Sequence, residues 1–87
     1  MPLFFFHRTD GKIERDTEGS ELPDLATAQE EAIIFLGQSI KDHPGMLKDT
    51  GELRVEVTGE DGLLLTTVIV HAIDAVAPEA FEKHLQS

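Results

Sequence analysis

The stretch that decides the fold is DLATAQEEAIIFLGQSIKD, residues 24–42. Its main apolar residues are Leu25, Ala28, Ala32, Phe35, Leu36 and Ile40. They recur at intervals that place side chains on one face of an α-helix. Asp24 is a residue type preferred at a helix N-cap, and Pro44 disfavours helical geometry in His43 before it. We therefore predict one amphipathic helix over residues 24–42, with Leu36 buried under a sheet.

Two strands are expected before this helix. Residues 3–8 contain three successive phenylalanines, which favour β structure, and Asp10-Gly11 is typical of a two-residue hairpin turn. The return strand would be residues 12–17, in which Ile13 is the only large apolar residue. Such a polar strand is expected at a sheet edge, where charges oppose pairing with other chains.

Two more strands are expected after a connector at residues 44–51. Residues 53–58 alternate apolar and polar side chains, the pattern of a strand with one buried face and one wet face. Residues 59–62 turn the chain, and residues 63–73 are apolar on both faces, so both faces should be covered. Pro78 is suited to opening a short C-terminal helix.

The predicted order is therefore β-β-α-β-β within one small domain, residues 1–87. The fold class is α+β, with one helix packed on one face of a four-stranded sheet. We expect the aromatic first strand and the apolar last strand to form the central pair. That gives the strand order second, first, fourth, third.

Composition excludes several classes of function. The chain has no cysteine, which excludes disulfide frameworks, thiolate catalysis and cysteine-based zinc sites. Seventeen acidic and seven basic residues give a net charge of -10, which repels phosphate backbones and anionic membranes. We therefore expect no nucleic-acid partner and no membrane partner. No basic leader and no apolar run of the ~20 residues that a membrane span needs is visible, so a cytoplasmic location is expected.

No arrangement of catalytic residues stands out. The histidines are His7, His43, His71 and His84, and none shows the short spacing typical of zinc sites. No serine lies in a nucleophile elbow, and no glycine-rich phosphate loop is present. We therefore predict no enzymatic activity, no cofactor and no metal. The acidic loop at residues 16–24 leaves cation binding open, although its spacing differs from that of an EF-hand. The alternative is a small-molecule or metal-binding protein that uses His7, His71 or this loop.

The predicted elements leave more apolar surface than one helix can cover. Ile34 falls on the exposed side of the helix, the last strand is apolar on both faces, and the phenylalanines alternate between faces. A two-fold dimer is the simplest way to cover such a patch, because a self-complementary surface needs no second gene product. We therefore predict a non-enzymatic, homodimeric interaction module, with an unidentified protein as a further partner. The candidate interaction residues are Phe4, Phe6, Ile34, Val68 and Val70.

Two motifs in residues 1–32 resemble a known family. They are the opening MPLFFFH and the pattern D-x-x-G-x-E-L-P-D-L at residues 16–25. The pattern is similar to that of short bacterial proteins, frequent in alphaproteobacteria, that carry a domain of unknown function; Phe4 stands where they usually have tyrosine. The resemblance supports the fold and implies no activity, substrate or cofactor. A weaker likeness of layout, to HicB-type antitoxins, implies an inhibitory or dimer-forming module.

Overall fold

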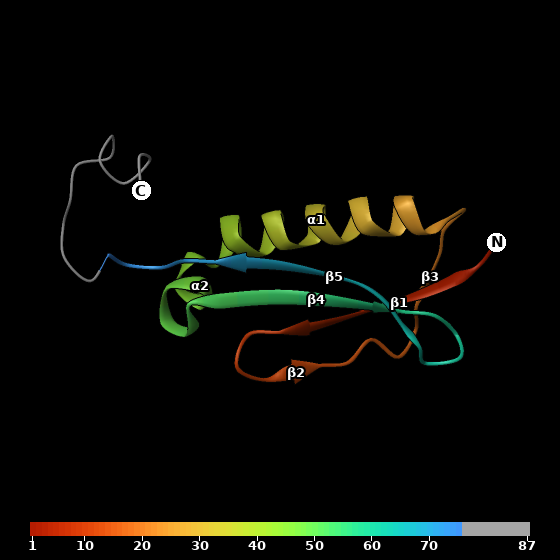
Figure 1. Ribbon diagram of the computed structural model, residues 1–87, viewed down its shortest axis with the longest axis horizontal. Helices are drawn as coiled ribbons and strands as arrows, with labels where there is room; N and C mark the ends of the chain where they lie inside the picture. The colour runs from red at the N-terminus through yellow and green to blue at the C-terminus, as the bar shows by residue number, and fades with distance from the viewer. Residues whose placement is uncertain (76–87) are drawn as a thin grey trace.

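The computed structural model describes residues 1–75, so the expected helix at Pro78 lies outside the described residues. The elements are β1 (Leu3–Thr9), β2 (Ile13–Glu14), β3 (Ser20–Glu21), α1 (Leu25–Asp42), α2 (Pro44–Thr50), β4 (Glu52–Thr58) and β5 (Leu64–His71). They form an antiparallel sheet with α1 packed on one face, which confirms the predicted α+β class (Figure 1).

The strand order differs from the predicted one. It is β2-β1-β4-β5, with β3 pairing with the start of β1, so the central pair is β1 and β4. Alternation in β4 explains this position, because Leu53, Val55 and Val57 are all completely buried. The apolar content of β5 suggested a central strand, yet Leu64 and Leu65 at its start are exposed. Strand β5 lies at the edge instead.

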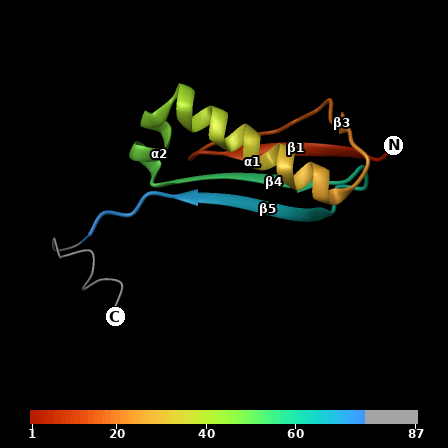
Figure 2. The same cartoon turned by 90° about the horizontal axis from the view of Figure 1, so that it is seen from above.

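Helix α1 runs obliquely over the sheet (Figure 2). The side chain of Asp24 caps it by accepting a hydrogen bond from the N–H of Thr27 at 2.8 Å, as predicted. Ala28 and Ala32 are fully buried, and their small side chains allow the helix backbone to approach the strands. Leu36 is only 1% exposed, which confirms the predicted core-facing side of the helix.

The connector at residues 44–51 contains a second helix, α2, which the sequence reasoning missed. Pro44 stops α1, but proline also suits the first turn of a helix, where its missing N–H is not needed. Gly51 ends α2 in the left-handed conformation at φ 76°. Met46 and Leu47 pack against the core, so the turn between α1 and β4 closes one end of the sheet.

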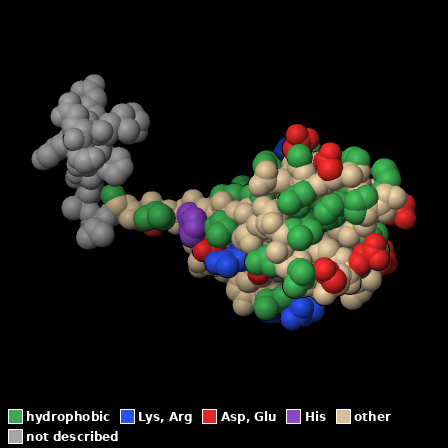
Figure 3. All heavy atoms as spheres, turned by 45° about the vertical axis from the view of Figure 1, so that its right-hand side comes forward, with side chains coloured by type: hydrophobic (Ala, Val, Ile, Leu, Met, Phe, Trp, Pro, Cys, Tyr) green, Lys and Arg blue, Asp and Glu red, His purple; other side chains and the backbone are tan. Residues whose placement is uncertain are grey.

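The strand register assigns each side chain to one face of the sheet. Phe6 lies opposite Val57, and Val55 lies opposite Val68, so these residues share the face that α1 covers. The other face carries His7 opposite Glu56 and, further along, Glu52, Arg54 and Thr58 from β4. The same face carries Phe5 opposite Thr58 and Ile69 opposite Arg54, so apolar side chains from β1 and β5 flank a polar strip formed by β4. Hydrophobic side chains still reach the surface (Figure 3), among them Ile33, Ile34, Leu63, Leu64, Leu65 and Ile69.

Candidate functional site

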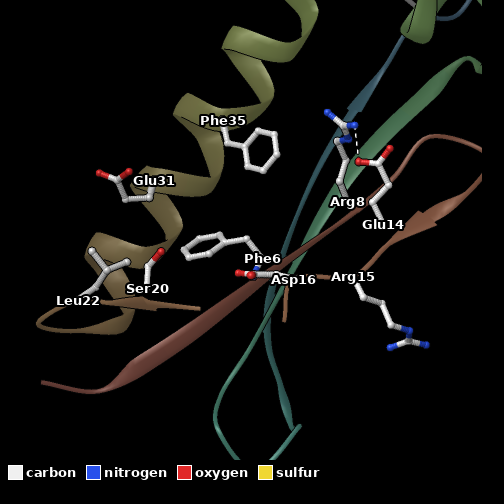
Figure 4. Close-up of a pocket in the computed structure, with 9 residues that line it drawn as sticks. All are labelled: Phe6, Arg8, Glu14, Arg15, Asp16, Ser20, Leu22, Glu31 and Phe35. Atoms are coloured by element: carbon white, nitrogen blue, oxygen red, sulfur yellow. Dashed lines mark hydrogen bonds and ion pairs between the residues drawn. The ribbon is translucent and has the colours of Figure 1, made fainter. Parts of the chain in front are cut away.

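A cleft of about 520 Å³ opens between α1 and β1 on the helix side of the sheet (Figure 4). Phe6 from β1 and Phe35 from α1 project into the same space, and Leu22 lies at one end of it. The remaining lining residues are Arg8, Glu14, Arg15, Asp16, Ser20 and Glu31. We call this the α1–β1 cleft: an apolar interior with a polar rim.

Arg8 joins three elements at this cleft. Its Nη2 forms an ion pair with Oε2 of Glu14 in β2, and its Cζ lies 5.7 Å from the centroid of the Phe35 ring of α1. The second distance is within the range of a cation–π contact. The Nε of Arg8 is buried and has no hydrogen-bond partner within residues 1–75. Arg8 therefore holds an unused donor beside an apolar space.

A hydrogen-bonded network lies on the opposite face of β1. The Nδ1 of His7 accepts the backbone N–H of Asp16 at 3.1 Å, and its Nε2 lies 3.0 Å from Oγ1 of Thr58. Because Nδ1 accepts, the proton of the neutral ring is on Nε2, which donates to Thr58. The carboxylate of Asp16 in turn accepts three backbone N–H groups, those of Phe6, Glu18 and Gly19, at 3.0–3.2 Å.

These contacts set the charge state of Asp16. Burial raises the pKa of its carboxyl, but hydrogen bonds from the backbone of Gly19, Phe6 and Glu18, together with nearby His7, lower it. The net effect places the pKa below its ordinary value. The ionised carboxylate is already committed to backbone donors. Within residues 1–75, no group of three or more His, Asp or Glu side chains is arranged to hold a metal ion.

The D-x-x-G-x-E-L-P-D-L motif at residues 16–25 consists of residues with structural roles. Gly19 has a φ of 76°, and a Cβ on it would lie 3.0 Å from atoms of Leu3 and Phe5. Leu22 packs against the core, and Asp24 caps α1. The motif builds the return from the sheet to the helix and does not require a ligand to account for these residues.

Strand β5 presents a long pairing edge. Only β4 pairs with it among residues 1–75. The N–H of Ala72 donates to the carbonyl of Gly51 at 3.0 Å, so alternation in an antiparallel pair turns the backbone groups of Thr67, Ile69 and His71 away from β4. We call this the β5 edge. Ile69 is 42% exposed, and residues 62–73 contain no Asp, Glu, Lys or Arg.

The opposite edge of the sheet is protected. Strand β2 has only two residues, Ile13–Glu14, and charged Lys12 and Arg15 flank it. Short, charged edge strands resist pairing with further chains. The predicted return strand over residues 12–17 is thus much shorter than expected, while its place at the edge is confirmed.

The sequence of the chain matches a known protein family. The family model for a domain of unknown function, DUF6894, matches residues 3–71. The chain belongs to the DUF6894 family. No curated protein and no solved structure matches it significantly. The matched range begins with β1 and ends with β5, so the DUF6894 domain comprises the folded sheet and its helices.

The DUF6894 domain does not gather the five predicted interaction residues on one surface. Ile34 is 53% exposed on α1, whereas Phe4 is 5% exposed and belongs to the core. Phe6, Val68 and Val70 are partly buried and pack against the core, because α1 covers their face of the sheet.

Sequence reasoning missed the α1–β1 cleft of this domain. The apolar spacing places Phe35 in the buried stripe of the helix, but the residue lies on the flank of that stripe, where it is 36% exposed. Its position at the border of the apolar stripe was the available signal.

No helix in residues 1–75 is long and apolar enough to cross a membrane.

Proposed function

We propose that this DUF6894 domain is a non-enzymatic, cytoplasmic association module that pairs with a second copy of itself through the β5 edge. The observation that carries the proposal is the eight-residue strand β5, whose outer edge has exposed apolar side chains and no Asp, Glu, Lys or Arg. Long apolar edges without blunting charges are templates for strand pairing. The cytoplasmic location rests on the acidic, cysteine-free composition.

Antiparallel pairing of two β5 strands would satisfy the outward backbone groups. With Ile69 on the two-fold axis, Thr67 of one copy lies opposite His71 of the other, and both positions are hydrogen-bonding ones. The same register places Val68 opposite Val70 on the helix side of the sheet. These two valines are only partly buried in the single chain, so pairing would cover them further.

Charge also favours this edge. Each chain carries a net charge of -10, so most approaches between two copies bring acidic groups together. Repulsion between exposed charges is screened beyond ~8 Å at physiological salt, but not at contact. The β5 edge is a long uncharged segment, and two copies meeting there avoid direct contact between carboxylates.

Light scattering of the full chain tests the proposal. We expect the dimer mass for the wild type at tens of micromolar. At that concentration, a dimer with a dissociation constant of ~10 µM is well populated. Ile69→Lys should give the monomer mass, because two ammonium groups would face each other across the axis. The matched control is Ile34→Lys, an equally drastic change at an exposed residue on α1, which should leave the dimer intact.

A charge-swap experiment locates the axis. Ile69→Lys and Ile69→Glu should each be monomeric, and mixing them in equal amounts should restore the dimer mass. A monomeric wild type would overturn the proposal. Loss of the dimer in Ile34→Lys but not in Ile69→Lys would move the interface to the helix and would also overturn pairing through β5.

A further inference from the structure

The α1–β1 cleft combines two features that call for a ligand. Its interior is formed by the rings of Phe6 and Phe35 with Leu22, side chains that are only partly buried. The Nε of Arg8 beside it is the one buried side-chain polar atom without a hydrogen-bond partner in residues 1–75. Buried polar groups are nearly always paired, with water among their usual partners, so an unpaired donor at the wall of a cavity marks a place where an acceptor fits.

We propose that the α1–β1 cleft binds a small apolar carboxylate. The apolar body of the ligand would lie between Phe6 and Phe35, and its carboxylate would bind the guanidinium of Arg8. Guanidinium and carboxylate groups match in a two-point geometry, and such charge-assisted hydrogen bonds are stronger than neutral ones. The cleft volume of about 520 Å³ lies within the usual range of ~300–1,000 Å³ for small-molecule sites.

The acidic residues around the cleft do not contradict an anionic ligand. Glu14 is paired with Arg8, and the Asp16 carboxylate is bound by backbone N–H groups. Arg15 and Glu31 then balance each other in formal charge at the rim. The remaining acids of the chain act from further away, where salt screens them. The lining itself holds two basic and three acidic side chains, so the attraction of a carboxylate rests on direct hydrogen bonds from the Arg8 guanidinium and not on the net charge of the cleft.

Access to Nε requires a movable wall, and Phe35 provides one. Its ring lies over the Arg8 guanidinium, yet the residue is more than a third exposed and is not held in the core. A small rotation of this ring away from the guanidinium would widen the access to Arg8 and leave the ring at the wall of the cleft. The ligand would then replace the cation–π contact with an ion pair, and its apolar body would lie between Phe6 and the displaced Phe35 ring.

Titration followed by amide NMR shifts tests the site with 2-naphthoate as the probe. A fragment of this size is expected to bind with a dissociation constant of ~1 mM. The shifts should concentrate at Phe6, Arg8, Leu22 and Phe35. Two analogues of the same shape, 2-naphthalenemethanol and 2-naphthylmethylammonium, test the charge. Each should bind at least tenfold more weakly; equal binding of the alcohol, or tighter binding of the amine, would overturn the carboxylate assignment.

Two variants that should change the affinity for 2-naphthoate in opposite directions separate an effect on binding from an effect on folding. Arg8→Gln should weaken 2-naphthoate at least tenfold. Glu14→Gln should strengthen it several-fold, because the guanidinium loses its internal partner. Arg54→Gln is the matched control, since Arg54 has a comparable ion pair with Glu52 on the other face of the sheet. An unchanged affinity in Glu14→Gln, or the same loss in Arg54→Gln as in Arg8→Gln, would overturn the site. These results are independent of the oligomeric state.

Discussion

The backbone N–H of Asp16 donates to Nδ1 of His7 at 3.1 Å, while the carboxylate of Asp16 accepts the N–H of Phe6, the residue before that histidine. Strand β2 pairs with β1 at Arg8 and Thr9, and β3 pairs with it at Leu3 and Phe4. Between these two points no strand residue of the described chain lies beside this edge of β1. Asp16 fills that gap with its own side chain and acts as a one-residue substitute for a strand.

Removal of the Asp16 carboxylate should destabilise the fold. Asp16→Ala leaves three backbone donors without their acceptor, and each buried unpaired group costs roughly 1–3 kcal/mol, less where water replaces the lost partner. We expect a loss of about 2 kcal/mol in the free energy of unfolding, measured by urea denaturation. Glu18→Ala, at an exposed position in the same loop, should change it by less than ~0.5 kcal/mol. Equal losses of stability in the two variants would contradict the role assigned to the hydrogen bonds of the Asp16 carboxylate.

Acid should weaken the domain in a defined pH range. Hydrogen bonds from Thr27 lower the pKa of Asp24, as backbone hydrogen bonds lower that of Asp16, so both lie below the ordinary value of 3.8. A group with a lowered folded pKa adds stability above its unfolded pKa, and that contribution disappears as pH falls through the folded pKa. The free energy of unfolding should thus fall below about pH 4. Asp16→Asn with Asp24→Asn should flatten this dependence; an unchanged slope would contradict it.

Two glycines should respond to alanine with opposite sign. Gly19→Ala forces a side chain into a positive φ and against Leu3 and Phe5, so we expect a destabilisation of ~1–3 kcal/mol. Gly37 lies on the exposed side of α1, and a Cβ added there would meet nothing within 4 Å, so Gly37→Ala should stabilise by up to ~1 kcal/mol. Thermal denaturation of the two variants measures both signs. A stabilising Gly19→Ala would refute the assigned turn.

The core-facing side of α1 predicts a large effect at one residue. Leu36→Ala should destabilise by ~2–5 kcal/mol, because a fully buried leucine leaves a cavity that the sheet cannot close. Ile34→Ala on the exposed side should change the denaturation midpoint little. Similar midpoints for the two variants would mean that the buried face of the helix has been assigned wrongly.

Proline substitution distinguishes the two edges of β5. The N–H of Thr67 points away from β4, so Thr67→Pro should leave the chain folded but weaken dimerisation at least tenfold, measured by sedimentation equilibrium. The N–H of Val68 points toward β4, so Val68→Pro should instead unfold the sheet, seen as loss of the β signal in circular dichroism. Unfolding by Thr67→Pro to the same extent would contradict the assigned direction of these groups.

The parts of the fold that local rules determine could be predicted from the sequence. Helix α1 and its cap are predictable because Asp24 and the apolar spacing lie within a single segment. The strand order could not be predicted in this way. It depends on which strand buries its side chains most completely, and the exposed leucines at the start of β5 look apolar in sequence just as the buried residues of β4 do.

The candidate sites show the same division. The uncharged character of the β5 edge is visible in residues 62–73, although its direction and its outward groups are not. The α1–β1 cleft was missed because Arg8, Glu14 and Phe35 come from three elements, and only their packing shows that Nε of Arg8 has no partner. Helix α2 was missed because Pro44 both ends one helix and starts the next, and only the first of these roles is evident from the residues before it.

The two edges of the sheet differ, and this difference limits how far the molecule can assemble. On the β1 side, two short strands and the Asp16 side chain occupy the outer hydrogen-bonding positions, and charges surround them. Only the β5 side offers an extended row of backbone groups within residues 1–75. A sheet with a single unpaired edge cannot polymerise through strand addition, because the first pairing event leaves no unpaired edge for a third chain. Strand pairing through β5, as proposed above, would therefore give a closed pair of chains and not a fibre.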